Sequence, residues 1–348
     1  MRGIRREYIR RAQRMGDFTI SVNLPKDWVR NAGIGPGDLV AMSVREDGAL
    51  VIRPSSIGRP RDFGRISRRV LAEECGDAGL LGRILVALYI AGADDLVIES
   101  AGRLDDAMLR EIRRVVFALN GANISEESEG RVTIRVFVDP AGSRVSDVLR
   151  RMSSICVEML EGSLNALRGM NADPLKSIDS QEMELNRHYW LAVRQLLLAA
   201  SRPELMGQIG VEDPGQIPGF RTVAKALEEV GDAAADAARE LALALRDGAL
   251  RPEPAAELSG YTEHVLGACR GAFDGWFGVD PVAANSAVNA LREARRKLRE
   301  AVARPSLGSA AAPYLYELAQ VAAACGTVAE MAINRSVIEA SRAGCVKR

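Results

Sequence analysis

Arginines gathered at the start of the chain are the residues best suited to chemistry. Residues 1–14 contain six Arg and one Glu. Guanidinium groups carry a permanent charge and bind phosphates and carboxylates through several hydrogen bonds at once. Residues 1–60 hold eleven Lys and Arg against six Asp and Glu, a net charge of +5, although the whole chain has a formal net charge of zero. A basic segment joined to a mildly acidic remainder predicts an anionic partner for the first part.

Residue patterns that support catalysis do not occur in the sequence. The two histidines, His188 and His264, fall in expected helices and are interpreted as structural. There is no G-x-S-x-G nucleophile motif and no P-loop, and the glycines at 33, 35 and 37 indicate a turn rather than a dinucleotide-binding loop. We therefore predict that the protein is not an enzyme.

The composition is that of a soluble globular chain with several domains. The 348 residues are 47% hydrophobic and 26% charged, and Ala, Leu, Arg and Glu favour helix. Five scattered cysteines without a C-x-x-C indicate neither a disulfide framework nor a zinc site. No apolar run approaches the roughly 18–20 residues that span a bilayer, and the arginine-rich start has no apolar segment behind it. These features predict a cytoplasmic protein that is not embedded in a membrane.

A small all-β module is expected over residues 1–55. Its expected elements are strands at 19–24, 39–44 and 49–53 and a short helix at 26–32. Pro25 suits the start of the helix and Gly33 suits its end, while Asp47-Gly48 is a hairpin signal between the last two strands. Because a module of this size buries little surface on its own, we expect dimerisation to stabilise it.

A small α+β domain is expected over residues 62–139, after a linker at 55–61. Its expected elements are helices near 63–74 and 80–91, a strand at 95–100, a helix from Asp105 to about Leu119, and a hairpin of 124–128 with 132–138.

An all-α body is expected over residues 143–348. Amphipathic helices are expected near 144–170, 178–201, 219–247, 254–277, 281–303 and 311–342. Prolines lie between these segments, as helix breakers do. Apolar residues recur at spacings of three and four along the helices, which is typical of a helical bundle, and six helices divide naturally into two sets of three.

The front module resembles the AbrB/SpoVT/MazE family of DNA-binding domains. The resemblance rests on the basic segment from Arg10 to Arg14, Leu24-Pro-Lys-Asp-Trp28, Gly35-Pro-Gly-Asp38 and Asp47-Gly-Ala-Leu-Val-Ile52. It implies an interlocked, swapped-hairpin homodimer that presents arginines to DNA, where guanidiniums neutralise phosphates and can contact guanine edges. The expected DNA contacts are Arg5, Arg6, Arg10, Arg11, Arg14 and Lys26. The alternatives are a solvated basic arm and a dimer module without DNA binding.

The rest of the chain resembles archaeal-type PhoU proteins, which are phosphate-uptake regulators that carry the same N-terminal module. The resemblance rests on ordered pieces at 85–92, 137–140, 148–152, 159, 194–196, Leu227-Glu-Glu-Val-Gly-Asp232 and Ala329-Glu-Met-Ala-Ile-Asn334. It implies two three-helix bundles in tandem. The fold class expected for the chain is therefore multidomain: a small all-β swapped-hairpin module, a small α+β domain and tandem three-helix bundles.

The PhoU resemblance also implies a carboxylate site. The family signature Glu-x-x-x-Asp, which binds metal ions in some members, corresponds to Glu228 and Asp232, with Asp236 one turn further. These residues share one helix face, which the helical periodicity directs away from the local core, and could supply oxygen ligands to a divalent metal or iron. The alternative without a function is that these carboxylates form a solvated acidic face. Ala323 and Thr327 stand where the second copy needs Glu and Asp, so a two-site arrangement is not expected.

The two resemblances together predict a dimeric, DNA-binding transcriptional regulator of phosphate uptake and homeostasis with a helical sensor body. The alternative is a phosphate-signalling adaptor that docks on a transporter ATPase or a sensor kinase, in which the front module only dimerises. No cofactor other than the metal considered above is implied.

Overall fold

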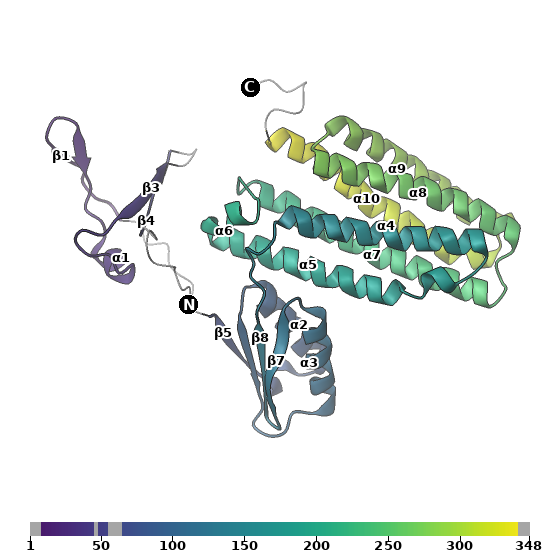
Figure 1. Cartoon of the computed structure of the whole chain (residues 1–348), viewed down its shortest axis with the longest axis horizontal. Helices are drawn as coiled ribbons and strands as arrows, with labels where there is room; N and C mark the ends of the chain where they lie inside the picture. The colour runs from purple at the N-terminus through teal and green to yellow at the C-terminus, as the bar shows by residue number, and fades with distance from the viewer. Residues whose placement is uncertain (1–7, 45–47, 55–64, 340–348) are drawn as a thin grey trace. The chain divides into compact units, whose positions relative to one another are not determined.

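The computed structural model of the chain describes residues 8–44, 48–54 and 65–339. Its internal contacts divide the chain into two compact units, 1–64 and 65–348 (Figure 1). The expected linker at 55–61 lies outside the described residues, as does Asp47 of the expected hairpin turn.

The first unit consists of two small hairpins and a short helix. β1 (Gln13–Met15) pairs with β2 (Thr19–Ser21), α1 (Lys26–Asn31) follows, and β3 (Val40–Val44) pairs with β4 (Leu50–Pro54). Both pairs are antiparallel. The expected helix and three strands are confirmed with small shifts of their ends. β1 was not expected: part of the predicted basic arm is a strand, in which Arg14 lies opposite Ile20.

A four-stranded sheet covered by two helices begins the second unit. The strands are ordered β5 (Ser67–Leu71), β6 (Asp95–Glu99), β8 (Arg131–Val136) and β7 (Ala122–Ser128), and only β5–β6 is parallel. α2 (Ala78–Ile90) and α3 (Asp106–Ala118) lie on the same side of the sheet (Figure 1). Asp77 caps α2 by accepting from the amide of Leu80, and Asp105 caps α3 by accepting from that of Met108. The predicted α+β character of this segment is confirmed.

The expected helix at 63–74 is wrong. Where this segment is described, it forms β5 and a single 3₁₀ turn (Ala72–Cys75). The sheet explains the difference, because β5 pairs with β6, 28 residues further along the chain (Ser67↔Asp95), and an ion pair joins Arg69 to Glu99 across the two strands. Tertiary pairing overrides a local apolar spacing that suits a helix.

Helices make up the remainder of the second unit. They are α4 (Val145–Gly169), α5 (Ile178–Ser201), α6 (Pro203–Gln208), α7 (Gln216–Arg246), α8 (Pro252–Gly278), α9 (Pro281–Val302) and α10 (Ala312–Ile338). The six expected long helices are confirmed, and the short α6 is an addition. Proline occupies the first turn of α6, α8, α9 and α10, where its missing N–H costs no hydrogen bond.

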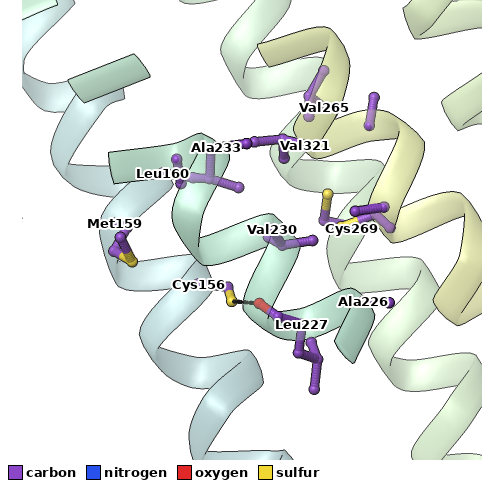
Figure 2. Packing of buried hydrophobic residues seen from close by; sticks show 14 of the residues in the cluster. Cys156, Met159, Leu160, Ala226, Leu227, Val230, Ala233, Val265, Cys269 and Val321 are labelled. Atoms are coloured by element: carbon purple, nitrogen blue, oxygen red, sulfur yellow. Dashed lines mark hydrogen bonds between the residues drawn. The ribbon is translucent and has the colours of Figure 1, made fainter. Parts of the chain in front are cut away.

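The long helices form two three-helix bundles that share one core. α4, α5 and α7 contact one another, as do α8, α9 and α10, while α7 packs along α10 and α4 along α8. Figure 2 shows this shared core, where Val230 and Cys269 are among the buried residues. The thiol of Cys156 on α4 lies 3.4 Å from the carbonyl oxygen of Leu227 on α7, the one hydrogen bond drawn there.

One helix has the length and composition of a membrane span. The segment Ser309–Ile338, which contains α10, meets both conditions, and 44% of its most apolar window is buried inside the protein. α10 packs against α7, α8 and α9, and its Leu315, Leu318 and Val321 are fully buried. Its apolar character is therefore accounted for by its packing in the core of the two bundles.

Candidate functional site

The described basic residues of the first unit lie on its surface. Arg10 and Arg11 precede β1, Arg14 lies in β1 and Lys26 begins α1, and all four are exposed. Arg5 and Arg6 lie outside the described residues. Exposed guanidiniums keep their hydration and their full positive field, which is what attracts a polyanion.

Two of these arginines make local contacts, Arg14 with the β1–β2 turn and Arg10 with residues that precede β1. Arg14 donates from Nε to the carbonyl of Gly16 at 3.2 Å and from Nη2 to that of Asp17 at 3.1 Å. The Arg10 guanidinium lies over the Tyr8 ring, 5.6 Å from its centroid. Arg14 therefore has a structural role in the turn, which sequence reasoning did not foresee.

The first unit has almost no interior of its own. None of its described residues is buried, and large apolar side chains are strongly exposed: Phe18 is 100% exposed, Ile9 88% and Val44 75%. Exposed apolar area of this density is unfavourable in water unless something covers it.

The predicted carboxylate residues lie on α7 but do not point cleanly away from the core. The Glu228 side chain is 12% exposed, Asp232 is half-buried and the Asp236 side chain is 58% exposed. The expectation that all three face away is therefore corrected for Glu228 and Asp232. The physical reason is the central place of α7, which packs against α4, α5 and α10 at once.

Basic side chains already neutralise this acidic face. Lys225 pairs with Glu228, and Arg239 pairs with Asp236 at 2.8 Å on the same helix. Arg239 also reaches α5, where it pairs with Asp179 at 2.8 Å and with Glu182. Two cations thus share the charge of the carboxylates on both helices.

Asp232 differs from its neighbours because it forms no salt bridge with any residue that the structure describes. Burial, and then the nearby carboxylates of Glu228 and Glu182, raise the pKa of Asp232 to about 6. A carboxyl that is partly protonated near neutral pH is a poor ligand for a hard cation. Among the residues that the structure describes, no group of three or more His, Cys, Asp or Glu side chains is arranged to hold a metal. Glu228 and Asp236 are engaged in salt bridges and the pKa of Asp232 is raised, so the residues as arranged do not fit a resident metal.

Family models match two parts of the chain. Residues 149–241 match the model for the PhoU domain, and residues 19–60 match the model for MazE, a bacterial antitoxin of antidote–toxin recognition. A segment that matches the PhoU domain thus follows a segment that matches MazE. The crystal structure of PhoU from Pseudomonas aeruginosa is also similar, with 17% identity and a TM-score of 0.44 over 56% of this chain and 92% of that chain. The sequence matches none of the curated proteins.

The extent of each match matters for the candidate residues. The PhoU domain match covers most of α4, all of α5 and α6 and most of α7, so it includes Glu228, Asp232 and Asp236, whereas α8, α9 and α10 follow it. The MazE-like match begins at Thr19, so it includes Lys26 and none of the five predicted arginine contacts.

Residues 194–196 entered the sequence analysis only through the PhoU resemblance, and the contacts that Arg194 and Gln195 make with residues 89–143 were not foreseen. Arg194 on α5 is 1% exposed and donates to the carbonyls of Tyr89 and Ala93. The adjacent Gln195 donates from Nε2 to the carbonyls of Pro140 and Ser143, each at 2.8 Å. The only available signal was the polar pair itself within an apolar helical run.

Proposed function

We propose that this protein is a homodimeric, DNA-binding transcriptional regulator of phosphate uptake and homeostasis, in which the front module contacts DNA and the helical body acts as the sensor. The PhoU domain indicates a role in phosphate homeostasis, and the MazE-like domain is consistent with DNA binding. The observation that carries the proposal is the surface of the first unit, where exposed arginines accompany an apolar surface with no cover of its own.

The apolar surface supports dimerisation of the front module. Side chains such as Phe18 and Val44 would be removed from water if a second copy packed on them, which is worth roughly 25 cal/mol for each Å² buried. Two modules would then present two sets of Arg10 and Arg11. A pair of basic surfaces related by two-fold symmetry suits a duplex with repeated half-sites.

The salt dependence of DNA binding tests the proposal. Binding of a fluorescent duplex is measured against salt concentration for the wild type and for the double variant Arg10→Ala/Arg11→Ala. Each lost phosphate contact lowers the slope of log K against log[salt] by about 0.9. An unchanged slope would refute the assigned DNA contacts, and absence of duplex binding at low salt would refute the function. The control is Arg246→Ala, which removes an exposed charge from α7 in the second unit.

The alternative function is a phosphate-signalling adaptor that docks on a transporter ATPase or a sensor kinase, with the front module serving only dimerisation. The start of the MazE-like match favours it, because the five arginines lie before Thr19. Chromatin pull-down separates the two functions: enrichment near promoters of phosphate-transport genes supports the regulator, whereas co-purification with a transporter ATPase and no DNA enrichment supports the adaptor.

A further inference from the structure

A row of arginines follows one face of α9 in the second bundle. Arg292, Arg295 and Arg299 are spaced by three and four residues, and Arg296 flanks them. This spacing places the three side chains along one stripe of the helix, while Leu291, Ala294 and Leu298 on the neighbouring stripe are buried in the core. α9 packs along α10, and Arg292 and Arg295 line a cavity together with residues of α10.

Three cavities meet at this stripe, and Arg295 lines all of them. One of about 180 Å³ lies against Ala323, Gly326 and Thr327 of α10, and one of about 310 Å³ is lined by the four arginines and Glu300. A third, of about 250 Å³, adds Tyr316 and apolar residues of both helices. We call these three cavities together the basic hollow.

Small residues on α10 leave the hollow open. Ala323 and Gly326 form part of its wall, and a Cβ added at Gly326 would meet no heavy atom within 4 Å. Thr327 stands beside them, and its hydroxyl has no hydrogen-bond partner within the described part of the chain. The wall therefore offers space and one free donor rather than a packed surface.

The charges of the hollow are unbalanced. Arg292 pairs with Glu330 at 3.3 Å, and Arg296 pairs with Glu293 and Glu300, each at 2.6 Å. Arg295 and Arg299 have no acidic partner among residues 8–44, 48–54 and 65–339. Arg295 is also half-buried, so part of its hydration is lost without an ion pair to replace it. An anion bound here would supply that missing partner.

We propose that the basic hollow binds a phosphoryl group, held by Arg295 and Arg299, which line two of its cavities together. Two unpaired guanidiniums match a dianion better than a singly charged carboxylate. The planar guanidinium fork of Arg pairs two oxygens of a phosphate at once. The ligand is inorganic phosphate or the phosphate of a small organic molecule, whose remainder would lie against Tyr316 in the third cavity. The proposal goes beyond the proposed function, because it needs neither the front module nor DNA.

Direct titration of the full-length protein at low ionic strength tests the site without DNA. Inorganic phosphate and adenosine monophosphate are titrated separately by calorimetry, with sulfate as a third titrant. We expect saturable binding that Arg295→Gln weakens by about tenfold or more. Arg295→Lys keeps the charge but loses the fork, so it should weaken binding less. Gly326→Leu projects from α10 into the cavity that Arg292 and Arg295 line, and it should weaken binding as Arg295→Gln does.

The matched control is Arg270→Gln, which removes the same charge from an exposed ion pair with Glu161 on another face of the bundle. It should change the affinity by less than about twofold. Far-ultraviolet circular dichroism and a thermal melt establish that each variant is folded. If adenosine monophosphate binds more tightly than phosphate, and Tyr316→Ala removes this preference, the ligand is an organic phosphate. If phosphate binds more tightly, the ligand is inorganic phosphate. Failure of both ligands to bind, equal affinity for sulfate, or unchanged affinity in folded Arg295→Gln overturns the proposal.

Discussion

Arg194 Nη2 donates a hydrogen bond to Asp94 Oδ1 at 2.9 Å, across 100 residues of sequence. The same guanidinium donates to the carbonyls of Tyr89 and Ala93, and its plane lies over the Tyr89 ring, 4.9 Å from the ring centroid. Asp94 in turn accepts from the amide of Ile66, directly before β5. One buried side chain of α5 therefore holds the point where β5 and β6 both begin.

Replacing Arg194 by Gln should destabilise the second unit. The shorter, neutral side chain leaves two backbone carbonyls and a carboxylate without their donor, so the free energy of unfolding should fall by about 3 kcal/mol. Urea denaturation followed by circular dichroism measures the change. The control is Arg113→Gln, which removes an exposed partner of Glu127 and should cost less than about 1 kcal/mol. Equal urea midpoints for wild type and Arg194→Gln would contradict the assigned role.

Ionisation of Asp232 should lower the free energy of unfolding as the pH rises from about 4 to about 6. Burial and neighbouring carboxylates raise the pKa of Asp232 to about 6, above the value near 3.9 of an unfolded chain. The folded state therefore binds this proton more tightly, and ionisation of Asp232 opposes folding.

The variant Asp232→Asn cannot ionise, so this loss of stability should disappear. At pH 7.5 it should be more stable than the wild type by about 1 kcal/mol, a figure reduced for the partial exposure of the group. Urea midpoints at pH 4.5 and 7.5 give the comparison, and exposed Asp274→Asn on α8 is the control. A wild type whose advantage over Asp232→Asn grows with pH would show that the assigned sign is wrong.

The protein should purify without a stoichiometric metal bound to the acidic face of α7. Lys225 and Arg239 already pair with its carboxylates, so a divalent cation or iron would have to displace them. Elemental analysis of the full-length protein, prepared without chelators, should find well below one ion for each chain. If the wild type holds a stoichiometric metal and the double variant Glu228→Ala/Asp232→Ala loses it, the prediction is wrong. The metal site implied by the family resemblance would then be present.

Phe18 should contribute to the dimer contact of the front module. It is fully exposed in the single chain, at the turn between β1 and β2. Phe18→Asp would place a charge in an apolar contact and should weaken dimerisation by about tenfold or more. Sedimentation equilibrium of the full-length protein measures the constant. Phe117→Asp, at a position 60% exposed on α3, is the control. If Phe18→Asp leaves the dimerisation constant unchanged, or if the wild type is monomeric, Phe18 does not belong to a dimer interface.

Much of the fold follows from local sequence signals. Prolines at first turns and apolar residues at spacings of three and four predicted the six long helices, whose ends agree with the structure within a few residues. Such signals succeed because helices are stabilised by contacts within one or two turns. The same kind of signal was wrong at 63–74, where pairing of β5 with β6 decides the structure.

For the candidate sites, the sequence by itself determined which charges are present and on which element each one lies: arginines at the front, carboxylates on α7 and a second arginine row on α9. Only the tertiary structure decided which of these charges are neutralised. Arg239 meets Glu182 from another helix, Arg194 meets Asp94 from another layer, and Arg295 meets no acid in the part of the chain that is described. The reason is physical: an ion pair depends on separations of a few ångströms and on burial, and neither is encoded in the spacing along the chain.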